Sequence, residues 1–167
     1  PLIIDVNGQK QLITPGSGVV NALNPKTGEE IWRCYYDQGY SVVPRPVYAH
    51  GMIFLSSGYD KPVLYAIKVD GKGDVTATHI AWKIEKAAPH NPSMAVIGDE
   101  LYFVADNGIL SCVDAKSGQV HYSERCTGPI SASLLAADGK LYLQDEKGLG
   151  VVVKPGKQFT ILAQNDL

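Results

Sequence analysis

The stretch "ALNPKTGEEIW", residues 22–32, decides the fold, because an apolar pair is followed by a polar turn and then by a segment that ends in tryptophan. Pro25 fixes the backbone φ angle at the start of a turn, and Gly28 provides a position where φ is free to be positive. The stretch therefore predicts two β-strands joined by a chain reversal. Its meaning for the whole chain depends on whether it recurs.

The pattern does recur, which indicates a repeat protein. The stretch "SCVDAKSGQVHY" at residues 111–122 matches it closely, a looser copy occupies residues 65–82, and a degraded copy occupies residues 151–159. A second set of markers consists of turn glycines that precede apolar runs, at successive separations of 43, 47 and 41 residues: Gly8, Gly51, Gly98 and Gly139. Two sets of markers that step together predict a unit of about 40 residues, the size of a four-stranded propeller blade.

The local signals within each unit are those of β-strands. Runs such as "ELYFVA" and "KLYLQ" are rich in aromatic and aliphatic residues and are bounded by glycine or by Asp-Gly, as expected of strands and hairpins. We therefore predict an all-β fold, a β-propeller of about four four-stranded blades that forms an incomplete arc of a six- to eight-bladed ring. Residues 1–167 are predicted to be a single propeller fragment, with approximate repeats 1–39, 40–87, 88–127 and 128–167, the last incomplete or degenerate.

A large aromatic residue closes three of the four units. A flat blade buries its faces only against its neighbours, so an aromatic side chain at this position is well placed to hold adjacent blades in register. The predicted structural docking residues are Ala22, Gly28, Trp32, Trp82, Gly118 and Tyr122.

These repeats resemble a known superfamily. The spacing Ala-x-Asp-x-x-x-Gly-Lys-x-x-Trp is similar to the docking motif of the PQQ-type propellers, which include quinoprotein dehydrogenases and the non-enzymatic outer-membrane assembly lipoprotein propellers. The chain keeps Ala22, Gly28 and Trp32 but has Asn24 and Glu29 at the Asp and Lys positions. More narrowly, the order "YSVVPRPVYAHGMIFLSSGYDKP", "DGKGDVT", "PHNPS" and "GDELYFVADNG" resembles uncharacterised PQQ-like repeat proteins of planctomycete-type bacteria. The resemblance implies the fold and a periplasmic or cell-envelope location, but one fold serves many functions.

Composition excludes some classes of partner. The formal net charge is -2 and the sequence pI is about 6.1, so a general nucleic-acid surface, which needs a basic patch, is not expected. No apolar run approaches the roughly 18 to 20 residues of a membrane helix, and we expect no direct membrane insertion. Cys34, Cys112 and Cys126 are expected to be small buried thiols, with one oxidised pair as the alternative.

The candidates for ligand contact are Arg45 and His90. They lie six residues before Gly51 and eight residues before Gly98, respectively, in the prolyl segments "VVPRPV" and "APHNPS". In propellers the innermost strand begins at the axial funnel, so the two residues are predicted to form a polar rim facing a ligand. The alternative is that Arg45 pairs with a carboxylate and His90 is solvated.

The segment "DGKGDVT" is a weak candidate for calcium binding. Asp70, Asp74 and Thr76 place oxygen atoms at near-alternate positions, and such a spacing lets ligands converge on one ion. Lys72 occupies a position where a ligand is needed, and no glutamate stands at the twelfth position. An exposed turn is therefore the favoured interpretation, and no metal site or other cofactor is predicted.

A non-enzymatic protein-binding or scaffold module of the bacterial cell envelope is the predicted function, and no catalytic residue is assigned. The alternatives are part of a PQQ- and calcium-dependent alcohol or sugar dehydrogenase, and a sensor domain of a signalling protein. In dehydrogenase relatives a Cys-Cys pair lies against the quinone, and no adjacent cysteines occur here. The expected partner is another protein or the remaining blades of the same chain, with a homodimer possible if this arc is the complete chain.

Overall fold

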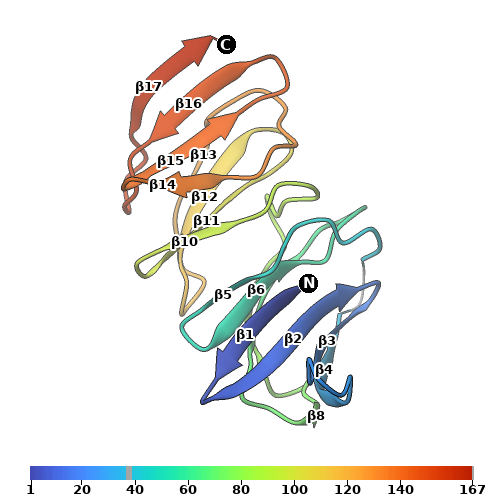
Figure 1. Ribbon diagram of the computed structural model, residues 1–167. Helices are drawn as coiled ribbons and strands as arrows, with labels where there is room; N and C mark the ends of the chain where they lie inside the picture. The colour runs from blue at the N-terminus through green and yellow to red at the C-terminus, as the bar shows by residue number, and fades with distance from the viewer. Residues whose placement is uncertain (37–38, 167) are drawn as a thin grey trace.

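The computed structural model describes residues 1–36 and 39–166, and in this part of the chain it shows seventeen β-strands in four sheets (Figure 1). The first sheet, blade 1, contains β1 (Leu2–Val6), β2 (Gln9–Gly16), β3 (Val19–Leu23), β4 (Glu30–Tyr35) and the short β8 (Gly73–Asp74). Blade 2 contains β5 (Val47–Ala49), β6 (Met52–Ser56), β7 (Leu64–Lys68) and β9 (Ile80–Ile84). Blade 3 contains β10 (Ala95–Ile97), β11 (Glu100–Val104), β12 (Ile109–Asp114) and β13 (Val120–Arg125). Blade 4 contains β14 (Leu135–Ala137), β15 (Lys140–Gln144), β16 (Leu149–Val153) and β17 (Ile161–Asp166).

The blades follow one another as an incomplete propeller of about four blades, which confirms the predicted fold class. Within each blade the four strands that follow one another along the chain pair antiparallel. The first strands β5, β10 and β14 lie next to one another in Figure 1, so the short strands form the inner side of the arc. No helix in the described residues is long and apolar enough to cross a membrane.

The hairpins that join the first two strands of each blade use two kinds of turn. In three blades both central residues have positive φ, as in His50 (53°) and Gly51 (71°) of blade 2, which is the pattern of a type I′ turn. In blade 3 only Gly98 (63°) is positive, and Asp99 follows it. Gly98 therefore aligns with His50 and not with Gly51, so a frame counted from the glycines is displaced by one residue in blade 3.

The core lies between the blades. Strand β6 is buried along its whole length because both of its faces are covered: Ile53 and Leu55 pack in the cluster shared with blade 1, and Phe54 packs in the cluster shared with blade 3. A third cluster, which includes Tyr102 and Leu141, joins blades 3 and 4. Stacking of flat sheets thus replaces a single central core.

The segment "DGKGDVT" is not the simple exposed turn that the sequence suggested. Its strand β8 adds to the outer edge of blade 1 in parallel, with Gly73 opposite Trp32 and Asp74 opposite Arg33. The N–H of Val75 donates to the Arg33 carbonyl at 2.9 Å. An insertion from blade 2 therefore covers the edge strand of blade 1, an edge that would otherwise expose unpaired backbone groups.

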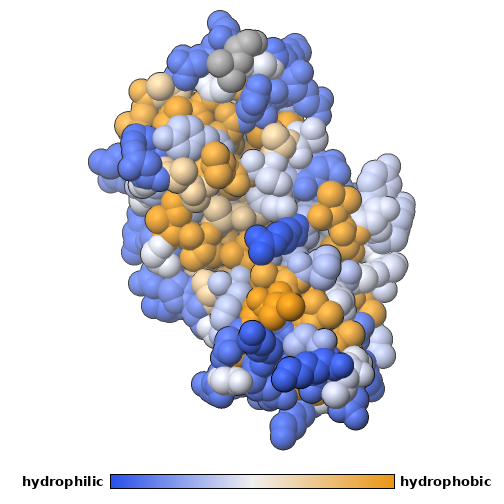
Figure 2. Space-filling view, viewed as in Figure 1, coloured by the Kyte–Doolittle hydropathy of each residue, from blue (hydrophilic) through white to orange (hydrophobic). Residues whose placement is uncertain are grey.

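Two blade faces carry exposed apolar side chains. Leu135 of blade 4 is 60% exposed and Ile3 of blade 1 is 57% exposed. Figure 2 shows apolar surface in the region where Figure 1 places β10 and β14, and again near β1. Surfaces of this kind are suited to contact with further protein.

Candidate functional site

The turns between the third and fourth strands of blades 1 and 3 have the same hydrogen bonds. In blade 1 the Asn24 side-chain oxygen accepts from the N–H of Lys26 at 2.9 Å. In blade 3 the Asp114 carboxylate accepts from the N–H of Lys116 at 3.1 Å and from the N–H of Ser117 at 2.8 Å. We call residues 24–29 and 114–119 docking turns 1 and 3. The asparagine that replaces the superfamily's aspartate therefore keeps the turn, because an amide oxygen also accepts.

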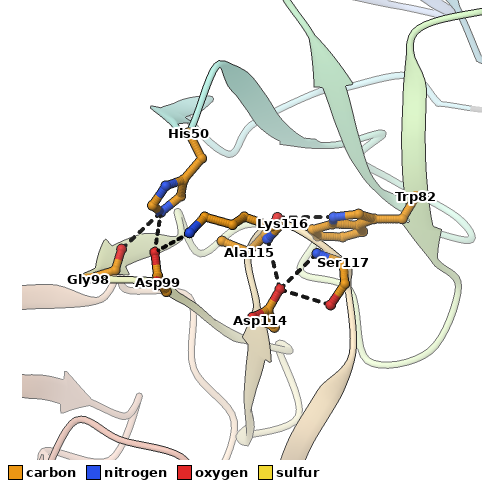
Figure 3. A network of polar contacts seen from close by, with 8 residues as sticks. All are labelled: His50, Trp82, Gly98, Asp99, Asp114, Ala115, Lys116 and Ser117. Carbon is orange, nitrogen blue, oxygen red and sulfur yellow. Dashed lines mark hydrogen bonds and ion pairs between the residues drawn. The ribbon is translucent and has the colours of Figure 1, made fainter.

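Docking turn 3 carries the tryptophan of the preceding blade (Figure 3). The Trp82 indole N–H donates to the Ala115 carbonyl at 3.0 Å. A Cβ atom built on Gly118 would lie 2.8 Å from the Trp82 ring, so only glycine leaves room for it. On its other side the Trp82 ring packs against Phe54, with 5.7 Å between ring centroids.

Trp32 and Tyr122 are also placed between blades, but with different neighbours. Trp32 is fully buried and donates to the side-chain oxygen of Gln11 at 2.9 Å, and the Gln11 amide donates to the Val69 carbonyl of blade 2 at 3.3 Å. Tyr122 packs against Phe159 of blade 4 at 5.5 Å between centroids. Gln11 was not predicted from the sequence, because it follows Gln9 and Lys10 in a polar run and only its burial in the structure sets it apart.

A polar network crosses from blade 2 to blade 3 beside Trp82 (Figure 3). The His50 Nε2 atom lies 3.0 Å from the Gly98 carbonyl and 3.5 Å from the Asp99 carboxylate, and Lys116 Nζ lies 2.9 Å from the same carboxylate. The Lys116 ammonium, which both hydrogen-bonds to Asp99 and attracts its charge, holds the pKa of that carboxyl below its usual value. These groups are exposed at the surface and connect neighbouring turns.

The structure places Arg45 at the inner end of the blades, among equivalent serines. Arg45, Ser93 and Ser133 each stand two residues before the first strand of their blade. The Arg45 N–H donates to Ser93 Oγ at 2.9 Å, and the Ser93 N–H donates to Ser133 Oγ at 3.0 Å. This chain of hydrogen bonds links three blades, and its central residue, Ser93, was not found from the sequence.

His90 lies elsewhere, in the segment that leads from blade 2 to blade 3. Its N–H donates to the Asp106 carboxylate at 2.7 Å, its Nδ1 lies 3.3 Å from the same oxygen, and its Nε2 lies 3.4 Å from the Asp60 carbonyl. His90 lines a cavity of about 660 Å³ whose lining does not include Arg45. The two predicted rim residues therefore do not share this cavity, and their role toward a ligand stays a prediction.

The oxygens of the candidate calcium segment are engaged in local contacts. Asp74 Oδ1 accepts from the N–H of Thr76 at 3.0 Å and from the Thr76 hydroxyl at 2.7 Å, and these bonds lower the pKa of Asp74. The Thr76 hydroxyl also accepts from the N–H of Tyr35 in blade 1 at 2.9 Å. Asp70 lies 3.6 Å from His79. Within residues 1–36 and 39–166 no three His, Cys, Asp or Glu side chains gather closely enough to hold a metal ion.

The three cysteines are free and buried, as expected. Burial raises the pKa of Cys34, Cys112 and Cys126 to about 11 in each case. The thiols are therefore neutral near pH 7 and are poor nucleophiles, since the thiolate is the reactive form.

Four-stranded blades stacked through aromatic side chains define this chain as a β-propeller of the PQQ-like class. A family model described as "Outer membrane protein assembly factor BamB" matches residues 16–158, and the chain belongs to this family. A comparison with curated proteins gave no match.

Solved structures show the same fold at low sequence identity. BamB from Moraxella catarrhalis is 15% identical with a TM-score of 0.69, and the match covers 97% of this chain and 46% of that one. The β-propeller domain of Cps50 (Swd1) from Myceliophteria thermophila is 13% identical with a TM-score of 0.63, covering 94% of this chain and 55% of that one. A europium-containing methanol dehydrogenase is 13% identical with a TM-score of 0.57, covering 71% and 23%. The chain thus spans about half the length, or less, of these three proteins.

Proposed function

We propose that this propeller is a non-enzymatic protein-binding or scaffold module of the bacterial cell envelope. The observation that carries the proposal is the family match over residues 16–158, because the family is described as a factor in outer membrane protein assembly. The exposed apolar side chains of blades 1 and 4, Ile3 and Leu135, support it by offering surface for further protein or for further blades.

The outer strand of blade 4 provides a second surface of this kind. All six residues of β17 are exposed, and they include Ile161 and Leu162. In the described part of the chain β17 pairs on one side only, with β16. An unpaired edge with apolar side chains is suited to binding an extended segment of another protein.

The second candidate is part of a PQQ-dependent dehydrogenase, favoured by the fold likeness to methanol dehydrogenase. The residues of this arc fit the cofactor poorly. A quinone needs a free aromatic face, and both tryptophans are used in docking: Trp32 is fully buried and Trp82 packs between Gly118 and Phe54. We assign no chemical step to this arc.

The test compares the two candidates on the full-length protein. Pyrroloquinoline quinone and calcium are titrated while absorbance and dye-linked oxidation of small alcohols and sugars are followed. In parallel, a photo-crosslinking residue is placed at Leu162, with a matched one at the exposed Glu124 of blade 3, outside the surfaces named above, as the control. A discrete protein adduct from position 162 alone, without turnover, is expected. Saturable quinone binding with turnover would overturn the proposal.

A further inference from the structure

The cavity that His90 lines lies at the end of blade 2, where the β6–β7 loop, residues 57–63, meets the segment 85–90 and the β11–β12 loop of blade 3. Its lining carries charges of both signs, with Asp60, Glu85 and Asp106 on one side of the balance and Lys61 and Lys83 on the other. Lys83 Nζ lies 2.8 Å from Glu85, and the His90 ring lies 3.3 Å from Asp106. A charged ligand would have to compete with these internal pairs, whereas a neutral polar ligand would leave them in place.

The walls combine small apolar side chains with hydrogen-bonding groups. Pro62, Val63 and Ala88 provide apolar surface, while Lys61 and Asn107 provide exposed donors on opposite sides. The volume of about 660 Å³ lies within the range of about 300 to 1,000 Å³ that is typical of small-molecule sites. The walls therefore suit a molecule that has both C–H surface and several hydroxyl groups.

Aromatic rings stand beside the cavity and face solvent. Tyr59 is 58% exposed and Tyr40 is 52% exposed, with 5.4 Å between their ring centroids. The Tyr59 ring also lies 6.0 Å from the His90 ring, which links the pair to the cavity wall. A tyrosine at such a rim presents an apolar ring face and a polar hydroxyl to the same ligand.

Backbone strain is concentrated in the same region. Among the residues that the structure describes, six non-glycine residues have positive φ, and three of them, Asn7, His50 and Asp138, are required by hairpin turns. The other three are Ser41 (54°), Asp60 (82°) and Ala87 (57°). Asp60 and Ala87 line the cavity, and Ser41 supports the loop that carries Tyr59, because a Cβ on Gly58 would lie 2.8 Å from the Ser41 carbonyl. Strain of this kind clusters at ligand sites.

The corresponding place between blades 3 and 4 is filled. A Cβ on Gly108 would lie 2.3 Å from the carbonyl oxygens of both Thr127 and Gly128, and Ile130 is 1% exposed. The cavity is therefore not a necessary result of blade stacking. It results from the longer β6–β7 loop of blade 2 and the path of segment 85–90.

From these observations we propose that the cavity binds a neutral saccharide, with a sugar ring against Tyr59 and its hydroxyl groups bonded to Lys61, Asn107 and Asp106. Asp106 Oδ1 accepts one hydrogen bond, from the Asn91 side chain at 2.6 Å, and a carboxylate oxygen has a second lone pair for a ligand hydroxyl. The site is independent of the protein-binding role proposed above. It involves neither β17 nor the open faces of blades 1 and 4.

Cellobiose, N,N′-diacetylchitobiose and the charged disaccharide digalacturonate are titrated into the full-length protein by calorimetry and by ¹⁵N NMR. The expected result is saturable binding of a neutral disaccharide with shifts confined to residues 57–63, 85–90 and 105–108. Tyr59→Ala should weaken binding by about two- to tenfold, the loss of one aromatic contact. Lys61→Met should weaken it by about tenfold, the low end of the loss expected for a hydrogen bond from a charged donor, because Lys61 is exposed.

The matched control is Tyr35→Ala, because Tyr35 is also exposed, at 48%, but lies on β4 and outside the cavity. It should bind the sugar like the unchanged protein. The proposal is overturned if neither neutral disaccharide binds at millimolar concentrations, if digalacturonate binds more tightly, or if Tyr59→Ala and Tyr35→Ala behave alike. Binding of a proline-rich peptide at these residues, in place of a saccharide, would also overturn it.

Discussion

Docking turn 1 and docking turn 3 share a side-chain cap and a glycine of nearly equal φ, 76° at Gly28 and 75° at Gly118, yet within residues 1–36 and 39–166 only turn 3 contacts the tryptophan of another blade. Nothing lies within 4 Å of the position that a Cβ on Gly28 would take, whereas the Trp82 ring fills that space at Gly118. The hydrogen bonds within each turn therefore form it without a neighbouring aromatic ring, and Trp82 packs against a turn conformation that does not depend on it. Local sequence determines the conformation of the docking turn, and blade packing determines whether a tryptophan lies against it.

The largest effects are expected from removing the aromatic residues. Trp32→Ala should cost about 3 to 5 kcal/mol of unfolding free energy, because the side chain is fully buried between blades. Trp82→Ala should cost about 3 kcal/mol, at the lower end, because part of the indole reaches solvent. Urea unfolding of both variants measures the difference, and an unchanged midpoint with unchanged denaturant dependence would contradict the placement of that tryptophan.

The two glycines provide the most direct test of the comparison. Gly28→Ala should cost about 1 to 2 kcal/mol, because it places a Cβ at positive φ without any clash. Gly118→Ala should cost about 2 to 4 kcal/mol, because overpacking against Trp82 is added to the same strain. Urea midpoints measure both values.

A double variant controls for the neighbour. In the Trp82→Ala background the added cost of Gly118→Ala should fall to that of Gly28→Ala, since the ring that causes the clash is gone. If the cost of Gly118→Ala stays the same without Trp82, the difference between the turns has another origin.

The fold was predictable because its signals are local and repeated. Gly28 and Trp32 lie ten residues or fewer from the start of the motif, and each blade repeats the same strand and turn pattern, so the confirmed fold class needed no long-range information. Strand β8 could not be predicted in this way. Its pairing with Trp32 and Arg33 joins segments about 40 residues apart, and its two residues carry no strand propensity.

The candidate site was less predictable for a related reason. Arg45 was counted six places back from Gly51, but His90 was counted eight places back from Gly98, and Gly98 takes the first position of its turn whereas Gly51 takes the second. The two differences together separate His90 from Ser93 by three residues. The residue that aligns with Arg45 is Ser93, which a change of turn type conceals in the sequence. The cavity at His90 is built from three separate segments, and no single stretch of sequence contains it.

The caps of the two docking turns differ in charge, so they should differ in their response to pH. Hydrogen bonds from the Ser117 hydroxyl and N–H hold the pKa of Asp114 below its usual value, and Asn24 does not titrate. Because the folded-state pKa lies below the unfolded value of about 3.9, the carboxylate contributes fully above that value and loses its contribution as the pH falls through the folded-state pKa. The stability advantage of the unchanged protein over Asp114→Asn should therefore shrink between about pH 5 and pH 2.

The matched variant Asn24→Asp should behave in the opposite sense. It introduces a titrating cap into docking turn 1, and its stability relative to the unchanged protein should fall over the same acidic range. Urea midpoints measured across this range give both differences. A constant difference between the unchanged protein and Asp114→Asn would show that the Asp114 charge does not stabilise the turn.

The smallest effect is expected from the ion pair beside docking turn 3. Lys116 and Asp99 are 56% and 58% exposed, so Lys116→Met should cost about 0 to 1 kcal/mol, and added salt should reduce that cost. Lys26→Met is the control, because Lys26 holds the equivalent place in docking turn 1, where its backbone N–H donates to the Asn24 side-chain oxygen. A loss at Lys116 as large as that of Trp82→Ala, and independent of salt, would mean that the ion pair within blade 3 matters as much to docking turn 3 as the aromatic contact does. A small, salt-sensitive loss would leave the contact between the Trp82 indole and Gly118 as the main difference between docking turn 3 and docking turn 1.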